Sequence, residues 1–171
     1  LMLPKVPYDP LKDFAPVSLI GTSPSLVTIN AALPVQNVRE LIAFAKARPG
    51  QLTFASSGPG TAPHLAGELM KTMAGIDMVH VPYKGGGPAY IDLLAGQVTV
   101  YIGGISAALP HVNRGKLRGI AVTSLKRTNL MPGVPTVDES GLPGYEVINW
   151  YSVVATAGAP KTVVARLNRE V

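Results

Sequence analysis

The chain has 171 residues, 47% hydrophobic and 15% charged, which is enough apolar material for a folded core and excludes a disordered, solvating chain. Its formal net charge is +5, yet no run of Lys and Arg exceeds two residues and aromatic residues make up only 6%, so we expect no nucleic-acid partner. The absence of cysteine excludes disulfides, thiolate metal ligands and cysteine nucleophiles.

The N-terminal residues 1–24 are rich in proline and show little periodicity, which predicts a connector. From Leu26 onward, short apolar runs alternate with segments of helical periodicity. Asn37 and Glu40 have the spacing of a capping box. Strands are predicted at 26–30, 52–56, 78–83, 98–102 and 117–123, and helices at 37–49, 62–74, 88–95 and 105–114, the last with a break at Pro110.

Strands that alternate with helices in this way are typical of βαβ units. The sequence therefore predicts an α/β fold, a doubly wound three-layer domain with a mostly parallel sheet. After Ser124 the rhythm changes, with a short helical piece predicted at 137–140, a β-rich run at 147–156 and a final helix at 160–171. This tail is predicted to belong to a second structural unit.

Both ends of the sequence look cut, which predicts a piece of a longer protein. The chain begins at Leu1 without a signal peptide, and the final helix stops without a C-cap. That helix places Val163, Val164 and Leu167 on one face, so self-association of the truncated chain is a further hypothesis. The longest uncharged stretch, residues 14–38, contains prolines and asparagines and is not predicted to span a membrane.

Three Gly-rich loops are predicted at the edge where parallel strands end and where ligands of such sheets bind. They are residues 56–61, 84–88 and 103–106, and each opens a helix. Helix N-termini attract anions, and glycine lets the backbone approach a ligand closely. The loops therefore predict an anion site, with the alternative that the glycines only make tight turns. Side chains available there are Ser56, Ser57, Thr61, Tyr83 and Lys84.

The sequence offers no metal site and no cofactor motif. The histidines lack metal-ligand spacing, and no acidic residue lies in the three loops. Residues 58–63 resemble a dinucleotide fingerprint, but Pro63 stands where the third glycine belongs. His80 is predicted to be a structural residue with internal partners. His64 could donate to an anion or pair with Glu68, and both readings stay open.

An alternative function from another class is a small serine hydrolase of α/β type. Residues 104–108 resemble a nucleophile elbow with alanine at the final glycine position. In this alternative Ser106 or Ser57 is the nucleophile. His111 precedes every downstream acidic residue, which is against the usual hydrolase order.

Four spaced segments resemble the tripartite tricarboxylate transporter receptor family, the Bug-type solute-binding proteins. They are residues 54–69 (FASSGPGTAPHLAGEL), 79–89 (VHVPYKGGGPA), 109–118 (LPHVNRGKLR) and 135–145 (PTVDESGLPGY), followed by Trp150. The resemblance implies a periplasmic receptor with a type II periplasmic-binding fold, whose two domains close over a small carboxylate like a flytrap. It also implies delivery of that ligand to a membrane permease, and no enzymatic activity.

By this resemblance, residues 28–122 would form the ligand-binding second domain, with 1–27 and 123–171 as parts of the first. Residues expected to hold a carboxylate are Ser56, Ser57, Gly58, Gly60, Thr61 and His64, and residues expected to line the wall are Tyr83, Lys84, Gly85 and Gly86. Gly103 and Gly104 stand where relatives often carry an acidic residue. Its absence favours a di- or tricarboxylate with an uncharged middle, or an aromatic acid, over an amino acid.

Overall fold

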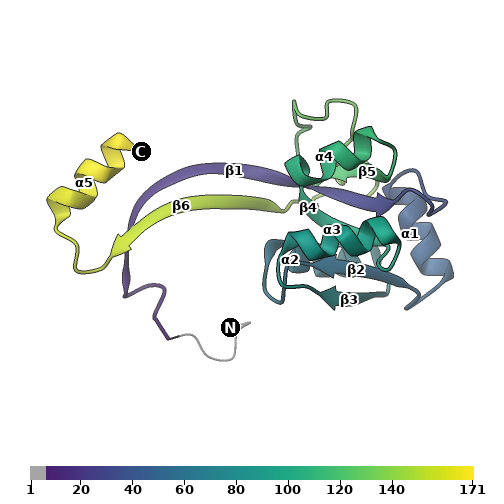
Figure 1. Ribbon diagram of the computed structural model, residues 1–171, viewed down its shortest axis with the longest axis horizontal. Coiled ribbons are helices and arrows are strands. Elements are labelled where there is room, and N and C mark those ends of the chain that lie inside the picture. Colours follow the sequence, from purple (N-terminus) through teal and green to yellow (C-terminus); the bar gives the residue numbers. More distant parts are fainter. Residues whose placement is uncertain (1–6) are drawn as a thin grey trace. The chain divides into compact units, whose positions relative to one another are not determined.

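The computed structural model describes residues 7–171, which divide into two compact units (Figure 1). We call the larger one, Pro24–Ile148, the core unit, and the smaller one, residues 7–23 with Asn149–Val171, the strand–helix unit. The first six residues of the predicted connector lie outside the described part. The division into domains at 1–27, 28–122 and 123–171 stays a prediction.

The first strand corrects the predicted connector. Strand β1 covers Phe14–Asn30, a run of 17 residues that begins well before the expected Leu26, and it pairs with β6, Ile148–Thr156. The prolines at 16 and 24 suggested irregular structure, but proline is compatible with strand positions that need no N–H donor. The partner strand is more than a hundred residues away in sequence, so local patterning does not show the pairing.

The sheet has the order β3-β2-β4-β1-β5, with β6 added to β1. Strand β2, Leu52–Ser56, runs parallel to β3, Met78–Pro82, and to β4, Val100–Gly104. Strand β1 runs antiparallel to β4 and to β5, Leu117–Val122. The mostly parallel sheet is therefore confirmed, with β1 as the strand of opposite direction.

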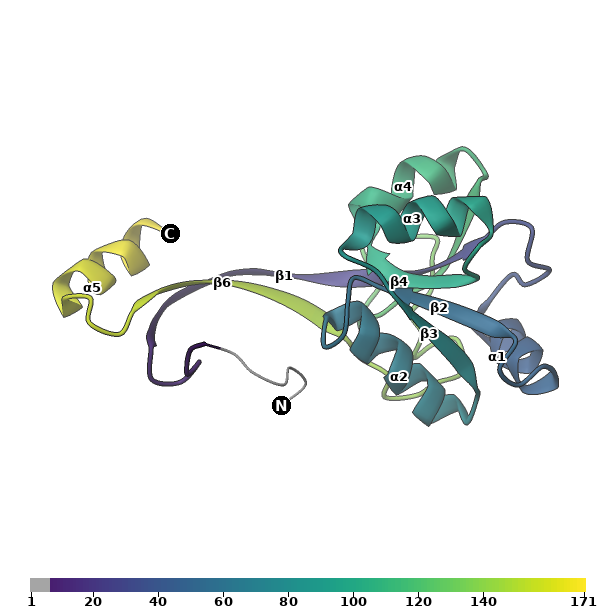
Figure 2. The same ribbon diagram turned by 60° about the horizontal axis from the view of Figure 1, so that its bottom comes forward.

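Helices cover both faces of this sheet, as the doubly wound prediction requires (Figure 2). One apolar cluster joins the sheet to α1, Val38–Ala47, and α2, Ala62–Ala74. A second joins the other face to α3, Gly86–Ala95, and α4, Ile105–Asn113. Helix α4 continues through the proline where a break was predicted. None of the helices found between residues 7 and 171 is long and apolar enough to cross a membrane.

The segment that follows β5 packs within the core unit. The short helix expected at 137–140 is wrong, because these residues form turns stabilised by the amide of Thr136, which donates to Glu139 Oε2 at 2.9 Å. The segment anchors itself through Tyr145, which is fully buried and donates its hydroxyl to Ala66 O at 2.9 Å. Long-range side-chain contacts thus hold this segment without regular structure.

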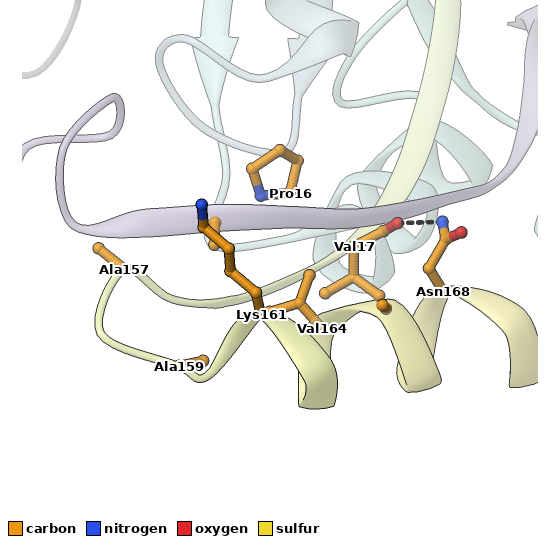
Figure 3. A pocket seen from close by; sticks show the side chains of 9 residues that line it. Pro16, Val17, Ala157, Ala159, Lys161, Val164 and Asn168 are labelled. Carbon is orange, nitrogen blue, oxygen red and sulfur yellow. Dashed lines mark hydrogen bonds between the residues drawn. The ribbon is translucent and has the colours of Figure 1, made fainter.

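The strand–helix unit contains the first part of β1, β6 and helix α5, Lys161–Glu170. A hollow of about 420 Å³ lies between Pro16 and Val17 on β1 and the start of α5, where Lys161 and Val164 lie (Figure 3). Asn168 donates a hydrogen bond from its side chain to Val17 O across it. Helix α5 buries none of its residues, and the predicted self-association through its apolar face stays a prediction.

Candidate functional site

The three predicted loops meet at one edge of the core unit. Because β2, β3 and β4 are parallel, their carboxyl ends point the same way, and they lead into α2, α3 and α4 respectively. Backbone bonds join the first two loops, from the Tyr83 amide to Ser56 O at 3.0 Å and from the Gly85 amide to Ser57 O at 3.2 Å. We call this part of the molecule the carboxyl edge.

The first loop is shaped by its own hydroxyl groups. Ser56 is fully buried, and its Oγ lies 2.6 Å from His80 Nε2 and accepts a bond from the Gly58 amide at 3.1 Å. Thr61 donates its hydroxyl to Gly58 O at 2.6 Å. Two of the predicted site hydroxyls therefore hold the loop in its turn, which leaves Ser57 as the serine of this loop nearer the surface.

Helix α2 begins directly after this loop with open backbone donors. Its N-cap, Thr61, makes no side-chain capping bond, and the first turn holds no acidic residue. The amides of Ala62 and His64 belong to this first turn, where helical geometry supplies no internal acceptor. Together with the helix dipole, these amides favour an anion at the carboxyl edge.

The structure resolves one of the two open readings of His64. Its Nδ1 accepts a bond from the Gly60 amide at 3.1 Å, so a neutral His64 carries its proton on Nε2. Glu68 does not pair with it but makes an ion pair with Lys71 at 3.1 Å. The role of His64 toward an anion stays a prediction.

Aromatic rings stack behind the first loop. The ring centroid of His80 lies 4.2 Å from that of His64 and 4.9 Å from that of Phe54. Burial, followed by repulsion from His64, lowers the pKa of His80 below its usual 6.5, which favours the neutral ring. Its bond to Ser56 gives His80 the internal partner that the sequence predicted.

The second loop places Tyr83 and Lys84 differently. Tyr83 donates its hydroxyl to Asp92 on α3 at 2.7 Å, and burial together with this carboxylate raises the pKa of Tyr83 to about 12. Lys84 is exposed. Gly85 is the N-cap of α3 with a φ of 105°, a backbone conformation that favours glycine.

The third loop is shorter than predicted, because Gly103 and Gly104 are the last residues of β4 and α4 begins at once with Ile105. Gly104 O accepts a bond from the Tyr90 hydroxyl at 2.9 Å. Ser106 is exposed in the first turn of α4, and no hydrogen bond joins it to a histidine among residues 7–171.

Sequence reasoning missed Tyr101, whose hydroxyl lies 2.8 Å from Ser57 Oγ. One signal for Tyr101 was available in the sequence. It is a large residue at the end of a strand, and glycine follows it two positions later at Gly103. No cluster of acidic or histidine side chains that could hold a metal occurs in the part of the chain that the structure describes.

These features define an α/β protein in which α2, α3 and α4 begin at one edge of the sheet, an arrangement that suits the binding of a small anion. The sequence matches the tripartite tricarboxylate transporter family receptor over residues 1–171. The chain belongs to this family, which consists of solute-binding receptors and not enzymes. The hydrolase alternative therefore has no support.

Relatives and solved structures agree with this assignment. A UPF0065 protein from the tcbD-tcbE intergenic region of Pseudomonas sp. (strain P51) is 41% identical over 169 residues, which is 98% of this chain and 50% of the relative. Protein BugT of Bordetella pertussis is 38% identical over 170 residues, 99% of this chain and 52% of BugT. The chain thus spans about half the length of the curated relatives it matches.

Among solved structures, R. palustris Rpa4515 with adipate superposes with a TM-score of 0.93 at 40% identity, covering 99% of this chain and 56% of that one. MatC of Rhodopseudomonas palustris with bound malate superposes with a TM-score of 0.88 at 32% identity, covering 98% of this chain and 57% of MatC. Periplasmic binding protein BugD superposes with a TM-score of 0.86 at 36% identity, covering 94% of this chain and 54% of BugD. The expected periplasmic-binding fold is confirmed.

Proposed function

We propose that this protein is a receptor for a small dicarboxylate, bound at the carboxyl edge of the core unit. The observation that carries the proposal is that α2, α3 and α4 all begin at this edge and none has an acidic residue in its first turn. Open amides at three helix N-termini suit a carboxylate, because charge-assisted bonds to backbone N–H groups are strong. The adipate and malate held by its relatives support the same ligand class.

Within the predicted site, the residues divide into three roles. Ser57, the Nε2 proton of His64, and the first-turn amides of α2 and α3 are the donors that we assign to the ligand. The predicted residues that shape the loops around these donors are Ser56, Gly58, Gly60, Thr61, Tyr83, Gly85, Gly103 and Gly104. Lys84, exposed beside the second loop, adds positive charge near the edge.

Calorimetric titration tests this proposal with adipate, malate, benzoate and hexanoate. It is run on the 171-residue chain and on a form extended to the length of the relatives. We expect a dicarboxylate to bind more tightly than hexanoate, and Ser57→Ala to weaken binding by about ten- to a hundredfold, the range for losing a hydrogen bond to a charged group. The control is Ser124→Ala, because the Ser124 hydroxyl donates to Lys126 O at 2.6 Å, outside the three loops. Binding of neither adipate nor malate by either form contradicts the proposal.

The proposal extends to location and partner. Relatives described as periplasmic binding proteins support a periplasmic receptor, and the family description supports delivery of the ligand to the membrane permease of a tripartite transporter. Uptake of labelled adipate by cells that carry the permease should require this protein in the periplasmic fraction. Uptake that is equal with and without the protein contradicts this part.

A further inference from the structure

Tyr101 occupies space that a side chain at position 103 would fill. The two residues lie on the same face of β4, because side chains in a strand alternate with a period of two. A Cβ atom built on Gly103 would come within 3.0 Å of several atoms of the Tyr101 ring. The ring therefore leans along the strand over Gly103, toward the carboxyl edge.

The hydroxyl of Tyr101 is held between two of the loops. It lies 2.8 Å from Ser57 Oγ, at the end of β2. A Cβ on Gly86, the first residue of α3, would lie 3.0 Å from the same hydroxyl, so the helix N-terminus approaches it closely. The Tyr90 ring packs edge-on against the Tyr101 ring at a centroid distance of 4.8 Å. The hydroxyl is thus fixed in position by its surroundings.

Two hydroxyl groups that bond to each other share one hydrogen and keep a second one for another acceptor. A phenol is a better donor than an alcohol, and burial raises the pKa of Tyr101, so its proton remains at neutral pH. Tyr101 is only 2% exposed, whereas Ser57 is half-buried at the edge. This arrangement favours donation from Tyr101 to Ser57 Oγ, with the hydrogen of Ser57 directed toward the edge.

We propose that Tyr101 is a positioning residue of the carboxylate site, which orients Ser57 as a donor to the ligand. This inference rests on the proposed function and adds the residue that orients Ser57, the serine donor of that site. Accepting a bond from the phenol also polarises the Ser57 hydroxyl, since hydrogen bonds in a chain strengthen one another. Tyr101 acts through Ser57 and does not itself touch the ligand.

A double-mutant cycle tests the coupling between Tyr101 and Ser57. It uses the protein form extended to the length of the relatives, and as ligand whichever of adipate and malate binds more tightly. Tyr101→Phe keeps the ring and should lower affinity about three- to tenfold, the range of one net hydrogen bond. Ser57→Ala should cost at least as much. The double variant should bind no more weakly than Ser57→Ala, because the effect of Tyr101 requires the serine.

Two further variants separate positioning from stability. Tyr145→Phe also deletes a buried phenol hydroxyl, which bonds Ala66 O, and should lower the melting temperature while leaving the dissociation constant unchanged. Gly103→Ala keeps every hydroxyl but displaces the Tyr101 ring, and should weaken binding as Tyr101→Phe does.

Unchanged affinity in Tyr101→Phe, or an additive double variant, would overturn the inference while the proposed function stands. If the unsubstituted form binds neither adipate nor malate, the inference falls together with the proposed ligand class.

Discussion

The core unit and the strand–helix unit contain similar apolar residues but bury them to different extents. In the core unit Leu26, Phe54 and Ile102 are fully buried, whereas Val17 is the only buried hydrophobic side chain of the strand–helix unit among the described residues. There, Trp150 is 69% exposed and Leu19 is 61% exposed. A helix or strand is stabilised chiefly by what its apolar face packs against, and within residues 7–171 only the core unit has apolar clusters on both faces of its sheet. The candidate ligand edge lies in the unit that has this complete core.

The largest expected difference between the units follows from truncating one apolar side chain in each. Phe54→Ala removes a fully buried ring and should lower the free energy of unfolding by about 3–5 kcal/mol. Leu167→Ala, at a position 40% exposed on α5, should change it by no more than about 0.5 kcal/mol. Urea unfolding followed by circular dichroism measures both. Equal losses would show that the strand–helix unit is packed as tightly as the core unit.

Adding one methyl group should also destabilise the core unit more than the strand–helix unit. A Cβ at Gly67, on α2, would come within 3.0 Å of the Phe54 ring, so Gly67→Ala should destabilise the protein by about 1–3 kcal/mol. A Cβ at Gly158 meets nothing within 4 Å, and Gly158→Ala should be neutral or slightly stabilising. Thermal melts of the two variants provide the comparison. A stable Gly67→Ala would mean that the ring can move aside.

The smallest expected effect is a pH dependence that belongs to the core unit. The pKa of His80 is lowered in the folded state, mainly by burial and then by His64, while Glu68 opposes the shift and Lys71 adds to it. The unfolded chain therefore binds more protons than the folded one as the pH falls below 6.5, and stability decreases over this range. Well above pH 6.5 His80 is neutral in both the folded and the unfolded chain, so it causes no loss of stability there.

Urea midpoints measured between pH 7.5 and pH 5 check this dependence. His80→Gln should flatten it, and His64→Gln should reduce it in part, since His64 contributes to the lowered pKa of His80. An unchanged slope in His80→Gln would assign the pH dependence to other groups.

Local signals in the sequence were sufficient for most elements of the core unit. The predicted 52–56 and 62–74 match β2 and α2, and the spacing of Asn37 and Glu40 predicted the start of α1, where the Glu40 amide donates to Asn37 Oδ1 at 2.9 Å. Apolar periodicity, caps and turn residues act over a few positions, so they are visible in the sequence alone. The same signals placed three loops at one edge once the strands were taken as parallel.

Tertiary structure decided the contacts between residues far apart in the chain. No local pattern in the sequence relates the residues that make these contacts. They are the antiparallel pairing of β1 with β4, the hydrogen bond between Ser56 and His80, and the hydrogen bond between Ser57 and Tyr101. Once the sheet aligns β2 with β3 and β4, these side chains come within hydrogen-bond distance, and buried polar groups are paired because leaving them unpaired is costly. The sequence alone therefore determined which segments form the carboxyl edge, while the packing of the sheet determined which hydroxyl groups shape its loops and left Ser57 only partly buried.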